Sequence, residues 1–230
     1  MKFTERSHAF IPASFYRRLT EAFGERGRQA FIHGTRYYGE QRGRRMAQRA
    51  IRDGRELDFE AYLQYSEWLN SDEAVKEGSS NVTEVEALSP DMTMKITRCA
   101  WHAQFRDSGM TEAGAEYCRH LDIAICRGFN PDLVFEVHKT LQTEDCCIHV
   151  LKGANFPDGA SFEKKREYVQ PFDYHCGHSY KCYSDVSAAI FGAEGVAVNA
   201  AVLEDFRAEF GDEMASRLID FRNTDFNTCR

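Results

Sequence analysis

The order in which two hydrophobic periodicities follow each other constrains this 230-residue chain most. Apolar residues recur at helical spacing near both ends, whereas two short central stretches alternate between apolar and polar residues. One helical stretch separates these two, and no repeat of strand, helix and strand appears. We therefore predict an α+β fold, with a central antiparallel sheet of about four strands and with N-terminal and C-terminal helices packed around it.

The sheet is predicted to consist of two β-hairpins. Ser89-Pro90-Asp91 favours a turn between the strands of the first hairpin, and residues 143–145 form the turn of the second. The four predicted strands are residues 82–88, 92–98, 133–137 and 146–151. Residues 80–225 are thus the α+β core, and residues 1–76 are a helical part of the same single domain.

Glycines and a threonine suggest where helices begin and end. In the N-terminal part we expect two or three helices, with a turn around residues 33–38. Thr111 can cap a central helix that Gly128 would end in a left-handed conformation. Near the C-terminus, Gly192 and Gly211 are expected to split the helical pattern into three helices.

The charge distribution argues against a nucleic-acid partner. Net charge is −7, and acidic residues such as Glu40 and Asp53 interrupt the arginine-rich stretch of residues 26–52. We therefore expect a solvated arginine face that docks on the acidic remainder of the chain. No apolar stretch approaches the ~20 residues of a membrane helix, and the first ten residues lack the apolar core of a signal peptide. These features predict a cytoplasmic chain without a membrane partner, for which a homo-oligomer is possible.

Eight cysteines in a chain of this kind are expected to be free thiols rather than disulfides. Each is then a core residue, a metal ligand or a nucleophile. The absence of CxxC and HExxH motifs gives no support to a compact zinc site, so no cofactor is predicted. A metal site built from His175, His178 and a distant Cys or Asp is the alternative.

Cys118 and Asp122 are four residues apart and therefore share one face of the predicted central helix. A thiol, a histidine and a carboxylate together can form an activated nucleophile, with His175 or His178 as the proton acceptor. Spacing alone favours the simpler alternative, in which Cys118 is a core residue and Asp122 a surface charge.

Several motifs nevertheless resemble one family. The central ones begin with Cys118, Asp122 and Cys126, continue through Gly128-Phe129-Asn130-Pro131, and end with Lys139-Thr140-Leu141 and Asp145-Cys146-Cys147. Flanking matches are Tyr38-Gly39-Glu40, Gly43, Met46-Ala47, Cys99-x-Trp101, Asp173-Tyr174-His175-Cys176-x-His178 and Phe210-Gly211-Asp212-Glu213-Met214. In order and spacing they resemble the L-2-amino-thiazoline-4-carboxylic acid hydrolase family over residues 35 to 215. Glu144 and His149 depart from the expected pattern, in which glycine and an aromatic residue stand there.

The resemblance implies hydrolysis of a small cyclic amidine, in which a thiazoline ring is opened to N-carbamoyl-L-cysteine. Cys118, Asp122, His175 and His178 are the expected catalytic residues, and Trp101, Thr140, Cys147 and Cys176 are expected to contact the small-molecule substrate. Cys118 is the first choice for attack on the amidine carbon, Cys147 or Cys176 the second, and water activated by a histidine the alternative. Three other functions remain open: a non-catalytic binding module, a metal-dependent hydrolase using His175 and His178, and a structural protein whose cysteines only pack.

Overall fold

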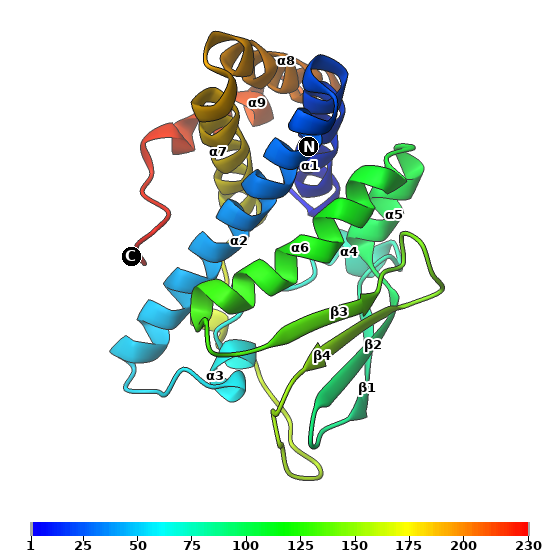
Figure 1. The fold of residues 1–230 in the computed structure, drawn as a ribbon, viewed down its shortest axis with the longest axis vertical. Coiled ribbons are helices and arrows are strands. Elements are labelled where there is room, and N and C mark those ends of the chain that lie inside the picture. Colours follow the sequence, from blue (N-terminus) through cyan, green and yellow to red (C-terminus); the bar gives the residue numbers. More distant parts are fainter. Residues whose placement is uncertain (1, 230) are drawn as a thin grey trace.

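In the computed structural model, which describes residues 2–229, one four-stranded antiparallel sheet lies against a group of helices (Figure 1). The strands are β1 (Val82–Ala87), β2 (Met92–Arg98), β3 (Phe135–Lys139) and β4 (Cys147–Leu151), in the order β1-β2-β4-β3. Both predicted hairpins are confirmed, and β2 pairs with β4 to join them. The predicted α+β class is therefore correct.

Helices flank the sheet from both ends of the sequence. They are α1 (Glu5–Phe23), α2 (Glu25–Arg52), α3 (Phe59–Gln64), α4 (Asp72–Lys76), α5 (Ala100–Asp107), α6 (Thr111–Phe129), α7 (Phe172–Phe191), α8 (Ala193–Phe210) and α9 (Asp212–Asp220), with short 3-10 turns at Arg166–Tyr168 and Phe221–Asn223. Helix α6 lies between the sheet and α2, α7 and α8 lie beyond α2, and α1 packs against α2, α5, α7 and α8 (Figure 1).

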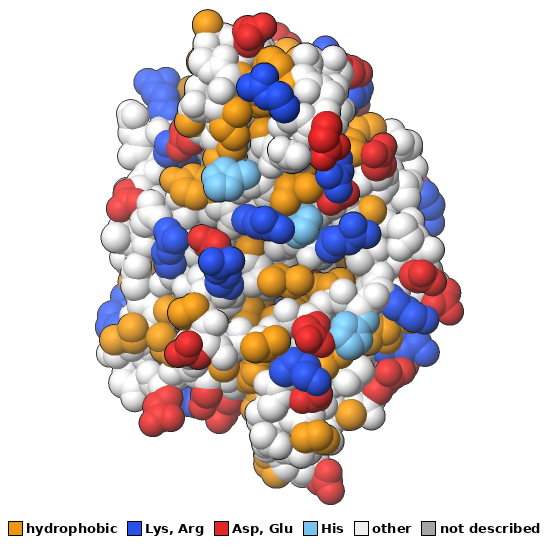
Figure 2. Space-filling model, in the orientation of Figure 1, with side chains coloured by type: hydrophobic (Ala, Val, Ile, Leu, Met, Phe, Trp, Pro, Cys, Tyr) orange, Lys and Arg blue, Asp and Glu red, His pale blue; other side chains and the backbone are white. Residues whose placement is uncertain are grey.

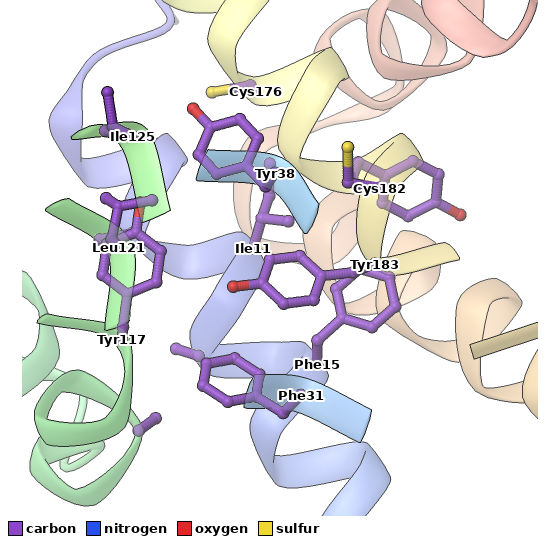
Figure 3. Packing of buried hydrophobic residues seen from close by; sticks show 14 of the residues in the cluster. Ile11, Phe15, Phe31, Tyr38, Tyr117, Leu121, Ile125, Cys176, Cys182 and Tyr183 are labelled. Atoms are coloured by element: carbon purple, nitrogen blue, oxygen red, sulfur yellow. The ribbon is translucent and has the colours of Figure 1, made fainter. Parts of the chain in front are cut away.

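The main core forms where α1, α2, α6 and α7 meet (Figure 3). Tyr183 of α7 stacks on Phe15 and Phe31, with ring centroids 5.1 and 5.3 Å apart. Tyr117 and Leu121 cover this group from α6. Aromatic pairs of this kind contribute about 0.5–1.5 kcal/mol each beyond the area that they bury. This core fixes the position of α6, which carries Cys118 and Asp122.

Glycines bring the backbones of α2 and α6 into direct contact. A Cβ atom on Gly43 would overlap the carbonyl oxygen of Ile125, and one on Gly128 would overlap that of Glu40. Close packing at glycines explains two wrong predictions, since a Cβ atom on Gly34 would likewise meet the Tyr183 ring at 2.6 Å. Helix α2 runs unbroken through residues 33–38, and Gly128 lies inside α6 rather than ending it. The glycines are needed for close packing and not for a turn.

Of the three other predicted helix boundaries, the one at Thr111 is wrong and the two at Gly192 and Gly211 are confirmed. Thr111 does not cap α6, because Met110 is the N-cap residue and no side chain hydrogen-bonds there. Gly192 and Gly211 do separate the C-terminal helices, and both have positive φ angles, of 58° and 88°. A further break occurs at Gly24, between α1 and α2.

The close α2–α6 contact predicts that Gly43→Ala destabilises the fold. The added methyl group cannot avoid backbone atoms, so overpacking is expected to cost at least about 2 kcal/mol of unfolding free energy. Urea denaturation measures this loss. A gain of up to about 1 kcal/mol, which is what helix propensity alone gives for Gly→Ala, would contradict the contact.

Candidate functional site

A cavity of about 200 Å³ lies between α6 and the sheet. Side chains alternate along a strand, so Met94 and Ile96 of β2 face α6 together with their cross-strand partners His149 and Cys147 of β4. Helices α2 and α6, the beginning of α5 and the segment after α3 supply the other walls. The cavity is smaller than the ~300–1,000 Å³ of pockets for drug-sized ligands, so its size suits a single small ring.

Two tryptophans form an aromatic wall of this cavity. The ring centroids of Trp68 and Trp101 are 5.0 Å apart, in a T-shaped arrangement. The indole Nε1 of Trp101 donates a hydrogen bond to His8 Nδ1 at 2.9 Å, and His8 Nε2 lies 2.9 Å from the Tyr38 hydroxyl. Because Nδ1 accepts, Nε2 carries the proton and donates to Tyr38. Helices α1 and α2 thus hold the Trp101 ring in place.

A buried carboxylate gathers three arginines of α2. Glu67, in the segment after α3, accepts two hydrogen bonds from Arg45 at 3.0 and 2.7 Å and one from Arg49 at 2.7 Å. The third, Arg42, has its Nε 3.8 Å from Glu67 Oε2. Although burial raises it, the three guanidinium groups bring the pKa of Glu67 down to about 2. The carboxylate is therefore ionised at neutral pH.

The expected solvated arginine face is wrong for Arg42, Arg45 and Arg49, all of which are buried. Other arginines of this region do lie at the surface, where basic and acidic side chains are mixed (Figure 2). Arg44, for example, pairs with Glu40 at 3.3 Å.

Arg42 differs from the other two arginines because it lines the cavity. Its side chain is 6 % exposed, and within residues 2–229 no group accepts a hydrogen bond from its guanidinium. One carboxylate, Glu67, faces three guanidinium groups, so the cluster carries excess positive charge. A buried charge without a full partner is costly, and an anion in the cavity would complete this cluster. Arg42 was not predicted as a site residue.

Three thiols also line the cavity: Cys99 before α5, Cys118 on α6 and Cys147 on β4. Burial raises the pKa of Cys147 to about 11, although the Leu141 N–H donates to its Sγ at 3.2 Å. Burial, with Cys99, Cys147 and Asp122 nearby, raises the pKa of Cys118 well above its ordinary value. Its surroundings therefore favour the protonated thiol over the nucleophilic thiolate.

Asp122 and His149 bring a carboxylate and an imidazole to the same cavity. Across the described part of the chain, no side chain forms a hydrogen bond or ion pair with Asp122. Burial lowers the pKa of His149, while the Asp122 carboxylate opposes that effect. His149 is therefore neutral at pH 7 and can accept a proton. It is a functional candidate that sequence reasoning missed.

Four of the eight predicted site residues line the cavity: Cys118, Asp122, Cys147 and Trp101. Of the other four, Thr140 is buried in the turn after β3, where its carbonyl accepts hydrogen bonds from the turn. Cys118 and Asp122 of α6 and Cys147 of the second hairpin thus line one cavity.

The C-terminal members of the predicted set lie elsewhere, in α7. His175 Nε2 donates to the Glu67 carbonyl at 3.0 Å, and His178 Nε2 lies 2.8 Å from Gln41 Oε1. The Sγ of Cys176 is 3.6 Å from Ser7 Oγ. All three side chains are buried and none lines the cavity. The two histidines belong to the surroundings of the arginine cluster.

Residues 2–229 contain neither a cluster of metal-binding side chains nor a membrane-spanning helix. No group of three or more His, Cys, Asp or Glu side chains there is arranged to hold a metal ion. None of the described helices combines the length and the apolar character that crossing a membrane requires.

The segment that builds the cavity is also the segment that matches a known family. The model of the L-2-amino-thiazoline-4-carboxylic acid hydrolase family matches residues 4–149, more than half of the chain. The chain belongs to this family. All cavity-lining residues fall within the matched segment, whereas His175 and His178 follow it. No curated protein and no solved structure matches the chain significantly.

Buried histidines near the arginine cluster predict a loss of stability in mild acid. Burial lowers the pKa of His175 to about 3 and holds the pKa values of His8 and His178 well below 6.5. Below pH 6.5 the unfolded chain binds protons that the folded chain does not, so each histidine is expected to cost about 2 kcal/mol at pH 5. Urea midpoints at pH 7.5 and 5 test this. Equal stability of the natural chain at both pH values would contradict the neutral, buried state of these histidines.

Proposed function

We propose that this chain hydrolyses 2-aminothiazoline-4-carboxylate, or a closely similar cyclic amidine with a carboxylate, in the cavity between α6 and the sheet. One observation carries the proposal: the incompletely paired Arg42 guanidinium and the Asp122 carboxylate line the same small cavity. The substrate of the family has the complementary charges, a carboxylate and an amidine that becomes cationic on protonation.

Arg42 is assigned to the substrate carboxylate. A guanidinium donates two parallel hydrogen bonds to a carboxylate, and here Glu67 only partly satisfies it. Asp122 is assigned to the protonated amidine. Its field also helps to raise the pKa of Arg42 against the effect of burial, so the two charges act within one site. Binding through both groups selects a zwitterionic ring over an uncharged one.

Ring opening needs a proton acceptor and a proton donor near the amidine carbon, C2. Protonation of the ring nitrogen makes C2 electrophilic, and Asp122 stabilises that cation. In the net reaction the elements of water are added at C2, the bond between C2 and the ring sulfur breaks, and the sulfur leaves as a thiol. His149 accepts the proton of the group that attacks C2 and returns it to the departing sulfur. The product contains a urea group, as N-carbamoylcysteine does.

The role of Arg42 can be tested with two substrates. We expect the natural chain to convert 2-aminothiazoline-4-carboxylate to a product heavier by one water, detected by mass spectrometry. Arg42→Gln is expected to lower kcat/KM by about 10- to 100-fold, since a charged hydrogen bond contributes about 1.5–3 kcal/mol. With 2-aminothiazoline, which lacks the carboxylate, both proteins are expected to be equally slow. An equal loss on both substrates would contradict the assignment.

The acid–base role predicts a different pattern for His149→Asn. We expect kcat to fall by about 10²–10⁴-fold, while the Kd of the substrate changes little, because Arg42 and Asp122 remain. His138→Gln is the matched control, since that side chain is exposed on β3. Saturable binding without turnover by the natural chain would identify a binding module instead of a hydrolase.

A further inference from the structure

Cys99 has surroundings unlike those of the other cavity thiols. It is the N-cap residue of α5, with extended backbone angles of −148° and 128°, so the first N–H groups of the helix are directed towards it. Its side chain lines the same cavity as Cys118 and Cys147. The positive end of a helix stabilises an anion, and a thiolate is the anion that a cysteine can form.

Polar groups near the Cys99 sulfur oppose the effect of burial on its pKa. Burial raises the pKa of Cys99, and the backbone N–H groups of His102 and Trp101 and the side chain of Asn81 oppose that increase. The backbone groups do so without a cap hydrogen bond of standard geometry. Asn81 Oδ1 accepts from the Ala100 N–H at 3.0 Å, which holds the Asn81 side chain at the N-terminus of α5 beside Cys99.

The two other thiols each have one donor. Gln142 Nε2 lies 3.9 Å from the Sγ of Cys118, and the Leu141 N–H lies 3.2 Å from that of Cys147. Cys118 lies inside α6 and Cys147 lies on β4, so a thiolate at either position would lack the helix N-terminus that faces Cys99.

We propose that Cys99 is the nucleophile that opens the ring; this assignment rests on the proposed function. A second, independent feature marks the cavity as a ligand site: Arg42 lines it, nine-tenths buried and without an acceptor for its guanidinium in residues 2–229. With the carboxylate held by Arg42 and the amidinium by Asp122, the ring is retained in the cavity that Cys99 lines.

The covalent route divides the hydrolysis into two balanced steps. His149 takes the Cys99 proton, Sγ bonds to C2, and the C2–sulfur bond of the ring breaks as His149 protonates the departing sulfur. The enzyme then carries an isothiourea on Sγ. Water attacks C2 in the second step, its proton passes to His149 and on to Cys99, and the Sγ–C2 bond breaks to release the urea product.

Labelling of the natural protein with 2-chloroacetamidine tests the reactivity of Cys99 without turnover. The probe has a cationic amidine, and attack by a thiolate forms an Sγ–carbon bond and releases chloride. Peptide mapping is expected to find Cys99 labelled first, at least about tenfold faster than Cys118 or Cys147. Asn81→Ala is expected to slow this labelling several-fold. Faster labelling of Cys118 or Cys147 would overturn the proposal.

Turnover provides the second test. Cys99→Ser keeps a good N-cap residue, so the variant is expected to fold, which circular dichroism checks. Its kcat is expected to fall at least about a hundredfold, whereas Cys229→Ser in the C-terminal tail keeps the natural rate. Acid quenching during turnover is expected to trap a substrate adduct on the Cys99 peptide.

The outcomes separate the two proposals. If the natural chain opens the ring and Cys99→Ser does so at the same rate, Cys99 is not the nucleophile, although the hydrolase function stands. If the natural chain opens no aminothiazoline carboxylate, both the proposed function and the covalent step are wrong. An adduct on Cys118 would transfer the role to that residue.

Discussion

The ion cluster at Glu67 holds together parts of the chain that are far apart in sequence. Arg45 bonds to Glu67 from α2 and also donates to the Phe226 carbonyl at 2.6 Å, and His175 of α7 donates to the Glu67 carbonyl. The Phe226 ring stacks on His178 at 4.1 Å, which seals the cluster with the C-terminal tail. Breaking a buried ion pair costs about 3–5 kcal/mol, so packing of α2, α7 and the tail depends on this carboxylate.

The same ion cluster that stabilises the fold also places Arg42 at the cavity. Arg45 and Arg49 take up the hydrogen-bonding capacity of Glu67, so Arg42 has only a distant ion pair of 3.8 Å. Gly43, the next residue, allows the backbone of α2 to touch α6, and this contact brings Arg42 to the cavity on the sheet side of α6. A charged group held in place before the ligand arrives needs no reorganisation during binding. The excess positive charge of the cluster thus lies at Arg42, which lines the cavity.

Local patterns predicted most of the fold. Alternating residues gave the two hairpins, and helical periodicity with Gly192 and Gly211 gave α7, α8 and α9, because these elements follow from neighbours in sequence. The errors at residues 33–38 and at Gly128 have one cause. In both places glycine is required by a partner helix, and a single sequence does not show which helix lies opposite. Periodicity identifies the buried face of a helix, but it does not identify the helix that packs against that face.

In the candidate site, too, the sequence predicted contacts within one element better than contacts between distant elements. Helical spacing joined Cys118 to Asp122, and strand alternation implies that His149 faces the same side as Cys147. His175 and His178 were also expected in the site, but their side chains contact Glu67 and Gln41 and do not line the cavity, which spacing within one helix does not reveal. Arg42, Arg45 and Arg49 recur at helical spacing on the face of α2 that also carries Tyr38 and Met46. Buried arginines at core spacing need a buried carboxylate such as Glu67, and the positive charge left over at Arg42 supports the proposed anion site.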